Sequence, residues 1–354
     1  MKKVRILSLD GGGMRGIIPA TVLEYVENKI IEITKNPNAR LADYFDMVAG
    51  TSTGGILSGF YLTPSKTLFK EDPISKYKAS EALDFYSKDG YKIFNESKKF
   101  GWFGLRQLFN AAQYSPKELE RILHREFRHL HLKELLKPCI ITTYNLQSKN
   151  SFFFSSREPI NKDRAFYLKD VLRSTSAAPT YFPPAFIKNI STQKEMINID
   201  GGVFANNPAM CAYSEARATD FGDISFPGAK DILVLSIGTG GGQFDLPNVK
   251  KSSNWGILPW ATSIPDIMMD GSIDTVDYQM KNIFDTLNQK DKFNYKRVDV
   301  PKGKRTYSSD MADASPENVE ALKKAGIEAL KAAQTKGENE YTLDEFIYQL
   351  IENN

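Results

Sequence analysis

The chain has 354 residues, of which 41% are hydrophobic and 25% are charged, so it can bury a substantial core. Its formal net charge of +3 at pH 7 is close to neutral and argues against nucleic acid as the main partner. Two cysteines, Cys139 and Cys211, make no disulfide framework and suit the cytoplasm.

The first residues resemble the start of a signal peptide. Their apolar run is too short, however, and ends at Asp10 and the glycines that follow, so a signal peptide is not predicted. No stretch of the sequence approaches the roughly 18 apolar residues of a spanning helix. We therefore expect any role at a membrane to be peripheral.

The first strand is predicted over Val4–Leu9 and the first helix over Ile17–Lys35. Between them, Gly11, Gly13 and Gly16 fit G-x-G-x-x-G, the pattern of a loop that binds a dinucleotide. Such a site also needs an acidic residue at the end of the next strand, about 20 positions further on.

The second strand, predicted at about Phe45–Ala49, ends in Gly-Thr-Ser rather than in an acidic residue. The phosphate-loop signature G-x-x-x-x-G-K-[ST] is also absent from residues 10–20. The sequence therefore predicts no nucleotide cofactor, and the first loop presents its backbone N–H groups to something else.

Residues 50–54, Gly-Thr-Ser-Thr-Gly, match G-x-S-x-G between this strand and a helix predicted over Ile56–Leu62. This context favours Ser52 as a nucleophile on a sharp turn, where flanking glycines relieve crowding. The N-terminus of the following helix would then stabilise a developing oxyanion. The alternative is a glycine-rich turn with a capping Ser or Thr.

The first glycine loop gains a role beside such a serine, because loops after neighbouring strands of a parallel sheet open on the same edge. Glycine allows backbone N–H groups to approach a substrate carbonyl closely. Arg15 would orient this loop or hold an anionic head group, and a plain surface salt bridge is the alternative. The expected N–H donors are Gly11, Gly12 and Gly13.

A serine nucleophile usually works with a histidine base. The three histidines lie within eight residues, in or just after a charged helix that Ser115 and Pro116 are expected to begin. This setting favours a solvated helix face over a catalytic or metal site, and no metal is predicted. The three are His124, His129 and His131.

Asp200 is the other candidate base, because it ends a short apolar stretch and precedes two glycines. A carboxylate is a weak base for a serine hydroxyl unless burial raises its pKa. An ordinary Asp-Gly turn is the alternative interpretation of this segment.

Further strands are predicted in the segments PCIITTYNL, SFFFSS and ILVLSIGTG, and further helices over Ile273–Leu287 and Ser315–Ala333. The alternation predicts an α/β fold with a mostly parallel sheet covered by helices. We expect one domain over residues 1–335, with a lid or regulatory insertion at 65–113, and a helical tail over 336–354.

Three motifs, DGGGMRG, GTSTGG and IDGG, follow one another in this order. Together with STSAAPTYFPPAF, DGGVFANNP and ILVLSIGTG, they make the chain, from residue 4 to about 335, resemble the patatin-like phospholipases. The resemblance implies a three-layer α/β/α sandwich and a lipid acyl hydrolase with an acyl-serine intermediate and no metal. It also implies Ser52 as nucleophile, Asp200 as proton acceptor, and an oxyanion loop formed by the first three glycines and Arg15. The other motif residues are Gly16, Gly50, Gly54, Gly201 and Gly202.

The resemblance also implies a membrane phospholipid or lysophospholipid as substrate, with galactolipid open, and peripheral contact with the membrane during activity. Lys98–Phe109 and Asn254–Trp260 combine aromatic and basic or apolar residues, as interfacial segments do, although each could pack under a long loop instead.

Three alternatives remain beside a constitutive hydrolase. One is the same phospholipase activated by a small molecule, as the cyclic-nucleotide-activated members are in bacterial antiviral defence. Another is a binding or storage protein with a vestigial site, and the third is an acyltransferase. A homo-oligomer also stays open.

Overall fold

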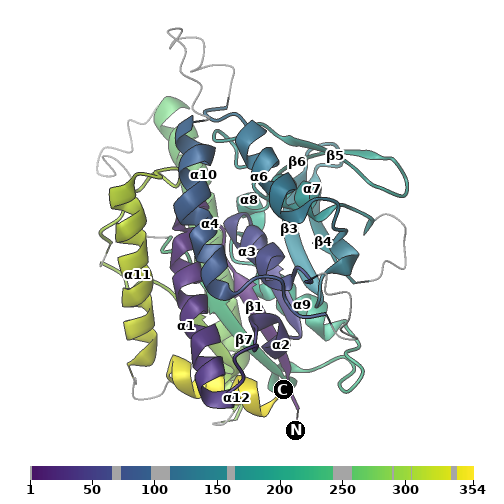
Figure 1. Cartoon of the computed structure of the whole chain (residues 1–354), viewed down its shortest axis with the longest axis vertical. Coiled ribbons are helices and arrows are strands. Elements are labelled where there is room, and N and C mark those ends of the chain that lie inside the picture. Colours follow the sequence, from purple (N-terminus) through teal and green to yellow (C-terminus); the bar gives the residue numbers. More distant parts are fainter. Residues whose placement is uncertain are drawn as a thin grey trace.

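The computed structural model describes residues 2–65, 73–96, 112–157, 164–241, 257–288, 291–303, 305–335 and 341–354 (Figure 1). The strands are β1 (Val4–Leu9), β2 (Met47–Gly50), β3 (Cys139–Asn145), β4 (Asn150–Ser155), β5 (Ala185–Lys188), β6 (Glu195–Asp200), β7 (Ile232–Ile237) and β8 (Tyr295–Val298). The helices are α1 (Ile17–Thr34), α2 (Leu41–Tyr44), α3 (Thr53–Leu62), α4 (Ala79–Tyr91), α6 (Lys117–Phe127), α7 (Leu168–Thr175), α8 (Gly202–Ala205), α9 (Ala209–Arg217), α10 (Ile257–Asp285), α11 (Pro316–Gln334) and α12 (Leu343–Glu352).

Within these residues the strands form one sheet in the order β5-β6-β3-β2-β1-β7-β8, with β4 paired to β3. The central strands β3, β2, β1, β7 and β8 run parallel to one another, whereas β4, β5 and β6 pair in antiparallel fashion. The carboxyl ends of β1 and β2 therefore lie at the same edge of the sheet.

The pairing of β3 places the end of β6 directly beyond the end of β2. One edge of β3 pairs with β4. Along its other edge, residues 139–141 pair with β2 and residues 143–145 pair with β6. Gly50 of β2 lies opposite Ile141, and Asp200 of β6 lies opposite Thr143. Because the two strands approach from opposite directions, their last residues meet.

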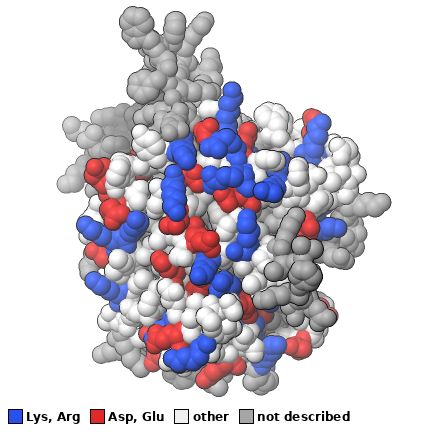
Figure 2. All heavy atoms as spheres, in the orientation of Figure 1, with Lys and Arg blue, Asp and Glu red and all other residues white. Residues whose placement is uncertain are grey.

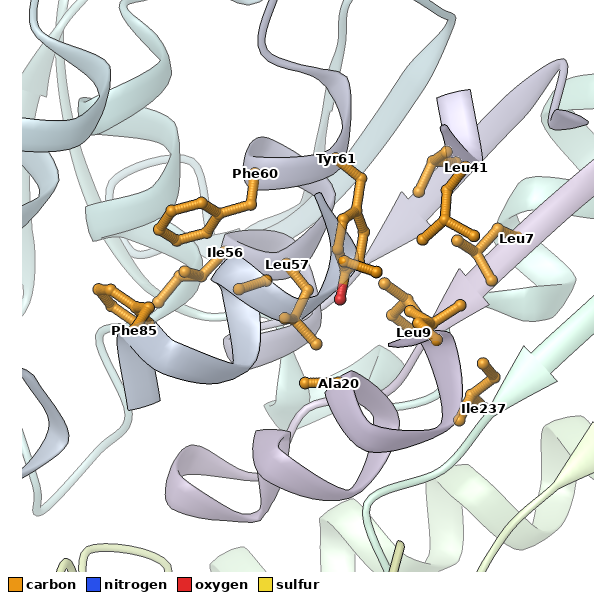
Figure 3. Packing of buried hydrophobic residues seen from close by; sticks show 14 of the residues in the cluster. Leu7, Leu9, Ala20, Leu41, Ile56, Leu57, Phe60, Tyr61, Phe85 and Ile237 are labelled. Atoms are coloured by element: carbon orange, nitrogen blue, oxygen red, sulfur yellow. The ribbon is translucent and has the colours of Figure 1, made fainter. Parts of the chain in front are cut away.

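Alternate side chains of the parallel strands enter two separate cores, as expected for a sheet covered on both faces. Leu7 and Leu9 of β1 pack with α1, α3, α4, α7 and α11, whereas Val4 and Ile6 pack with α9 and the second half of α10. This gives helix, sheet and helix layers. Figure 3 shows the first core, where Leu57 and Tyr61 of α3 lie among Leu7, Leu9 and Ala20.

The three-layer α/β/α fold with a mostly parallel sheet is confirmed, and most predicted elements lie within a few residues of their expected positions. Three boundaries differ. The second helix begins at Thr53 rather than Ile56, and α10 begins well before Ile273. The helix α6 begins at Lys117 with Pro116 as its N-cap residue, and Ser115 Oγ accepts from the Lys117 N–H at 3.4 Å.

Residues 343–352 form α12, and its buried side chains join the same core as α1. Among the described helices, none combines the length and the hydropathy needed to span a bilayer. Figure 2 shows Lys, Arg, Asp and Glu side chains interspersed over the face in view, in keeping with the small net charge of the sequence. This face therefore presents no field of a single sign.

Candidate active site

Ser52 stands at the sharp turn between β2 and α3 and is the N-cap residue of that helix. Its backbone angles, φ 54° and ψ −120°, are in a region that residues other than glycine seldom adopt. Two glycines make the turn sterically feasible: a Cβ on Gly50 would lie 2.4 Å from Gly54 O, and a Cβ on Gly54 would lie 2.2 Å from Leu9 O. The half-buried Ser52 side chain thus projects from a strained strand-to-helix turn.

Neighbouring hydroxyl groups hold this turn in place. The Ser52 N–H donates to Thr175 Oγ1 at the end of α7, at 2.8 Å. Thr51 Oγ1 donates to Ala205 O at 2.7 Å and lies 2.7 Å from Thr142 Oγ1. The strained residue is therefore fixed from β3, α7 and α8 at once.

Asp200 ends β6 and is 4% exposed. Its Oδ1 accepts from the Gly202 N–H at 2.7 Å, and its carboxylate lines the same cavity as Ser52. Burial raises the pKa of Asp200 to about 7, although the interactions with the Gly202 N–H and the Ser52 side chain act in the opposite direction. The structure thus brings together a serine hydroxyl and a carboxylate that exchanges its proton near neutral pH.

The first glycine loop lies against the same serine. A Cβ on Gly11 would lie 3.2 Å from Ser52 Cβ and 2.2 Å from Asn206 Oδ1, so any larger residue would have to displace the Asn206 side chain. The Gly11 N–H donates to Asn206 O at 3.0 Å, and Gly11 O accepts from Thr239 Oγ1 at 2.7 Å. This residue is therefore fully committed to holding the loop.

Gly12 and Gly13 differ from Gly11 in their hydrogen bonding. Within the described part of the chain, their N–H groups have no protein acceptor, and both residues line a cavity together with Ser52 and Asp200. Gly13 has a φ of +59°, and the next N–H, that of Met14, donates to Met311 O at 2.8 Å. Two N–H groups are thus left to bind a ligand atom.

Arg15 is 4% exposed, on the short helix η1 (Gly13–Gly16), and its Nε donates to Gly12 O at 3.4 Å. The side chain therefore lies under the loop rather than on the surface. Gly16 packs where a Cβ would lie 2.2 Å from Thr53 Oγ1, which joins the loop closely to α3.

The cavity beside Ser52 is mostly apolar beyond the reactive groups. Its walls come from α3, α4, the short π-helix η2 (Lys92–Glu96), α6, the segment after α7, and α10. The apolar lining side chains include Ile56, Phe85, Ile93, Phe94, Leu119, Phe182 and Met269. Of residues 65–113, the expected insertion, the described part thus contributes α4 and η2 to this wall.

The histidines lie apart from this site. His124 is on α6, and His129 and His131 follow it, with ring contacts to one another and to Tyr167. None of the three is among the described residues that line the cavity. Within the described segments, no three His, Cys, Asp or Glu side chains are grouped so that they could hold a metal ion.

Several supporting residues were not predicted from the sequence. Asp10 is fully buried and paired with Arg297 of β8, and Asn206 and Thr239 hold Gly11. Asn206 lies within the quoted DGGVFANNP segment, which could have drawn attention to it, whereas nothing near Arg297 marks it. Of the two expected interfacial segments, Lys98–Phe109 lies outside the described residues, as do residues 254–256 of the other.

The family model and the similar proteins found by comparison agree with one another. Residues 7–213 match the family model described as patatin-like phospholipase. The chain is 36% identical over 352 residues to patatin-like protein 2 of Arabidopsis thaliana, covering 93% of this chain and 83% of that protein. It is 33% identical over 342 residues to patatin-17 of Solanum cardiophyllum, covering 93% and 84% of the two chains.

Proposed function

The chain belongs to the patatin-like phospholipase family, and we propose that it is a serine lipid acyl hydrolase of the phospholipase A type. The substrate would be a fatty-acyl ester of a membrane phospholipid or lysophospholipid. The observation that carries the proposal is that Ser52, on its strained turn, and the buried carboxylate of Asp200 line the same cavity and interact.

In the proposed first half-reaction, Ser52 Oγ attacks the ester carbonyl carbon while Asp200 accepts the hydroxyl proton. The carbonyl oxygen becomes negative and accepts hydrogen bonds from the Gly12 and Gly13 N–H groups, helped by the N-terminus of α3. The tetrahedral intermediate then collapses, the C–O bond to the leaving alcohol breaks, and Asp200 returns the proton to that alcohol.

The second half-reaction repeats this chemistry with water. Asp200 removes a proton from water, the hydroxide attacks the acyl carbon, and the bond to Ser52 Oγ breaks. The serine takes back the proton, and the fatty acid leaves. No step in this scheme needs a group other than the residues named and water.

The pKa of the base supports this role for a carboxylate. An Asp with its ordinary pKa near 4 is a weak acceptor for a hydroxyl proton, whereas burial raises the pKa of Asp200 to about 7. The carboxylate is then both largely ionised at pH 8 and basic enough to take part. The apolar wall formed by Ile56, Phe85 and Phe182 supports a fatty-acyl chain as the group beside the serine.

The test measures fatty-acid release from phospholipid vesicles by the wild-type protein, Ser52→Ala and Asp200→Asn. Both variants should lose release by at least about a thousandfold while remaining folded, as a cooperative unfolding transition would show. Full activity of Asp200→Asn would rule out the dyad. Release by the wild type without any added small molecule would rule out obligatory ligand activation, and transfer of acyl groups to added alcohols in preference to water would indicate an acyltransferase.

A further inference from the structure

The first half of α10 carries an exposed apolar face. Trp260, Ile264, Ile267 and Met268 are 42%, 44%, 38% and 47% exposed, and their spacing of four, three and one residues puts them on one side of the helix. Residues 257–265 contain no charged side chain. Single exposed apolar residues are ordinary, but a row of four large ones over successive turns indicates an interaction surface.

This face is continuous with the wall of the active-site cavity. Met269, the residue after Met268, lines the cavity that contains Ser52, and Ser272 Oγ accepts from the Asn206 N–H at 3.0 Å. One side of α10 therefore holds the site, and the adjacent side is exposed to solvent. Met269 directly follows the exposed Ile267 and Met268 in the sequence, with no charged residue between them.

The helix α4 repeats this arrangement from another wall of the cavity. Gly90 and Ile93 line the cavity, while Tyr91 between them is 50% exposed. In Figure 1, α4 and α10 extend to the end of the molecule opposite α12 and both termini, which is the end toward which β1 runs. Exposed apolar residues thus adjoin cavity-lining residues on two helices of its wall.

We propose that Trp260, Ile264, Ile267 and Met268 of α10, with Tyr91 of α4, form the surface that docks on a lipid bilayer. This inference rests on the proposed function, because a lipid substrate must leave a bilayer to reach Ser52. A protein partner or a second copy on this face would cover the cavity approach, whereas a bilayer there delivers the substrate. A Trp among aliphatic side chains is also typical of helices that lie in the membrane interface.

Residues 257–269 contain one charged residue, Asp266, and no basic one, so the attraction is hydrophobic rather than electrostatic. Binding should therefore occur on zwitterionic phosphatidylcholine vesicles and persist at high salt, where attraction between exposed charges is screened.

The experiment measures vesicle binding without turnover, using Ser52→Ala protein and flotation with phosphatidylcholine vesicles. In that background Ile264→Glu/Ile267→Glu should lower the partition coefficient of the protein between vesicles and buffer at least about tenfold. The matched control is Ile327→Glu on α11, an isoleucine that is 45% exposed, and it should bind as the Ser52→Ala parent does. In a Trp102→Phe/Trp255→Phe background, Trp260 fluorescence should shift to the blue on binding.

A second readout separates this proposal from the proposed function. With Ser52 restored, Ile264→Glu/Ile267→Glu should hydrolyse a water-soluble short-chain ester as the wild type does and lose release from vesicles. If the wild type does not hydrolyse the soluble ester, the proposed function is wrong. The flotation result then still tests whether the protein docks on a bilayer through this face. Unchanged flotation of the double variant, or equal loss in Ile327→Glu, would overturn the docking surface. So would conversion of a dimer to a monomer by the double variant with vesicle binding intact.

Discussion

Arg297 donates to both carboxylate oxygens of Asp10, with Nη1–Oδ1 and Nη2–Oδ2 distances of 3.0 and 2.6 Å. Asp10 is fully buried and directly precedes the glycine loop, and the same guanidinium also donates to Asp299 and Ser236. Burial opposes the charge on Arg297, but the two carboxylates outweigh it and hold its pKa well above its ordinary value. Arg297 of β8 thus holds the start of the glycine loop in place through its ion pair with Asp10.

The first prediction follows from this pair. Arg297→Leu leaves the Asp10 carboxylate buried without its cation, and we expect a loss of about 3–5 kcal/mol in the free energy of unfolding at pH 8. Without the guanidinium the pKa of folded Asp10 rises further above its unfolded value, so the folded state binds the proton more tightly. The loss should therefore shrink as the pH falls toward 6, which urea unfolding at the two pH values would measure.

The control for this prediction is the double variant Asp10→Asn/Arg297→Leu, which removes both charges. It should be more stable than the sum of the single changes implies, because the two groups are coupled. A loss in Arg297→Leu that does not depend on pH would contradict the argument, since it would then arise from packing alone.

The sequence was most informative where the chemistry is local. The turn at residues 50–54 and the segment around Asp200 each combine a reactive side chain with glycines within a few positions. The same holds for the strands, whose alternation with helices predicted a mostly parallel sheet that the structure confirms. The roles of Ser52 and Asp200 themselves stay predictions until the variants are measured.

The sequence was least informative where contacts are remote or local signals conflict. Asp10 and Arg297 are 287 positions apart, so no spacing rule relates them. The first half of α10 contains Pro259, Pro265 and Gly271, which disfavour a helix, and its apolar face points to solvent instead of a core. For that reason the predicted helix began only at Ile273.

A second prediction concerns Gly54→Ala. The new Cβ would lie 2.2 Å from Leu9 O and 2.8 Å from Asp10 O, which are backbone atoms of the adjoining strand and loop. Neither can move without displacing the glycine loop, so we expect a destabilisation of about 3 kcal/mol and loss of ester hydrolysis. Thermal unfolding and a soluble-ester assay would test both effects.

Gly271→Ala on α10 is the matched control for Gly54→Ala. A Cβ there meets nothing within 4 Å, and alanine favours the helix over glycine by about 1 kcal/mol. This variant should therefore be as stable as the wild type or more so. Equal destabilisation by both changes would mean that contact with Leu9 is not the cause.

A third prediction concerns Thr175, which accepts the Ser52 N–H at 2.8 Å and is fully buried. Thr175→Val keeps the shape of the side chain but leaves that N–H without its acceptor, at a cost of about 1–3 kcal/mol. The strained turn should then lose its fixed position, and kcat for a soluble ester should fall about tenfold or more. Thr175→Ser retains the hydroxyl and should keep most of kcat; equal loss in both variants would point to the missing methyl contact instead.

The last prediction uses the pKa of Asp200, which burial raises to about 7. Because the ionised carboxylate is the proposed base, kcat/KM for a soluble ester should rise with pH and level off above an apparent pKa near 7. The effect of Asp200 ionisation on stability has the opposite sign. A carboxyl group whose pKa is higher in the folded state stabilises the fold at low pH, and that contribution is lost as the pH rises through about 7.

Asp200→Asn should therefore be inactive at every pH and yet more stable than the wild type at pH 8. Since burial also raises the pKa of Asp10 to about 7, only the part of the pH-dependent stability that Asp200→Asn removes belongs to Asp200. A wild-type rate that stays constant between pH 5.5 and 8 would contradict the assignment of Asp200 as the base.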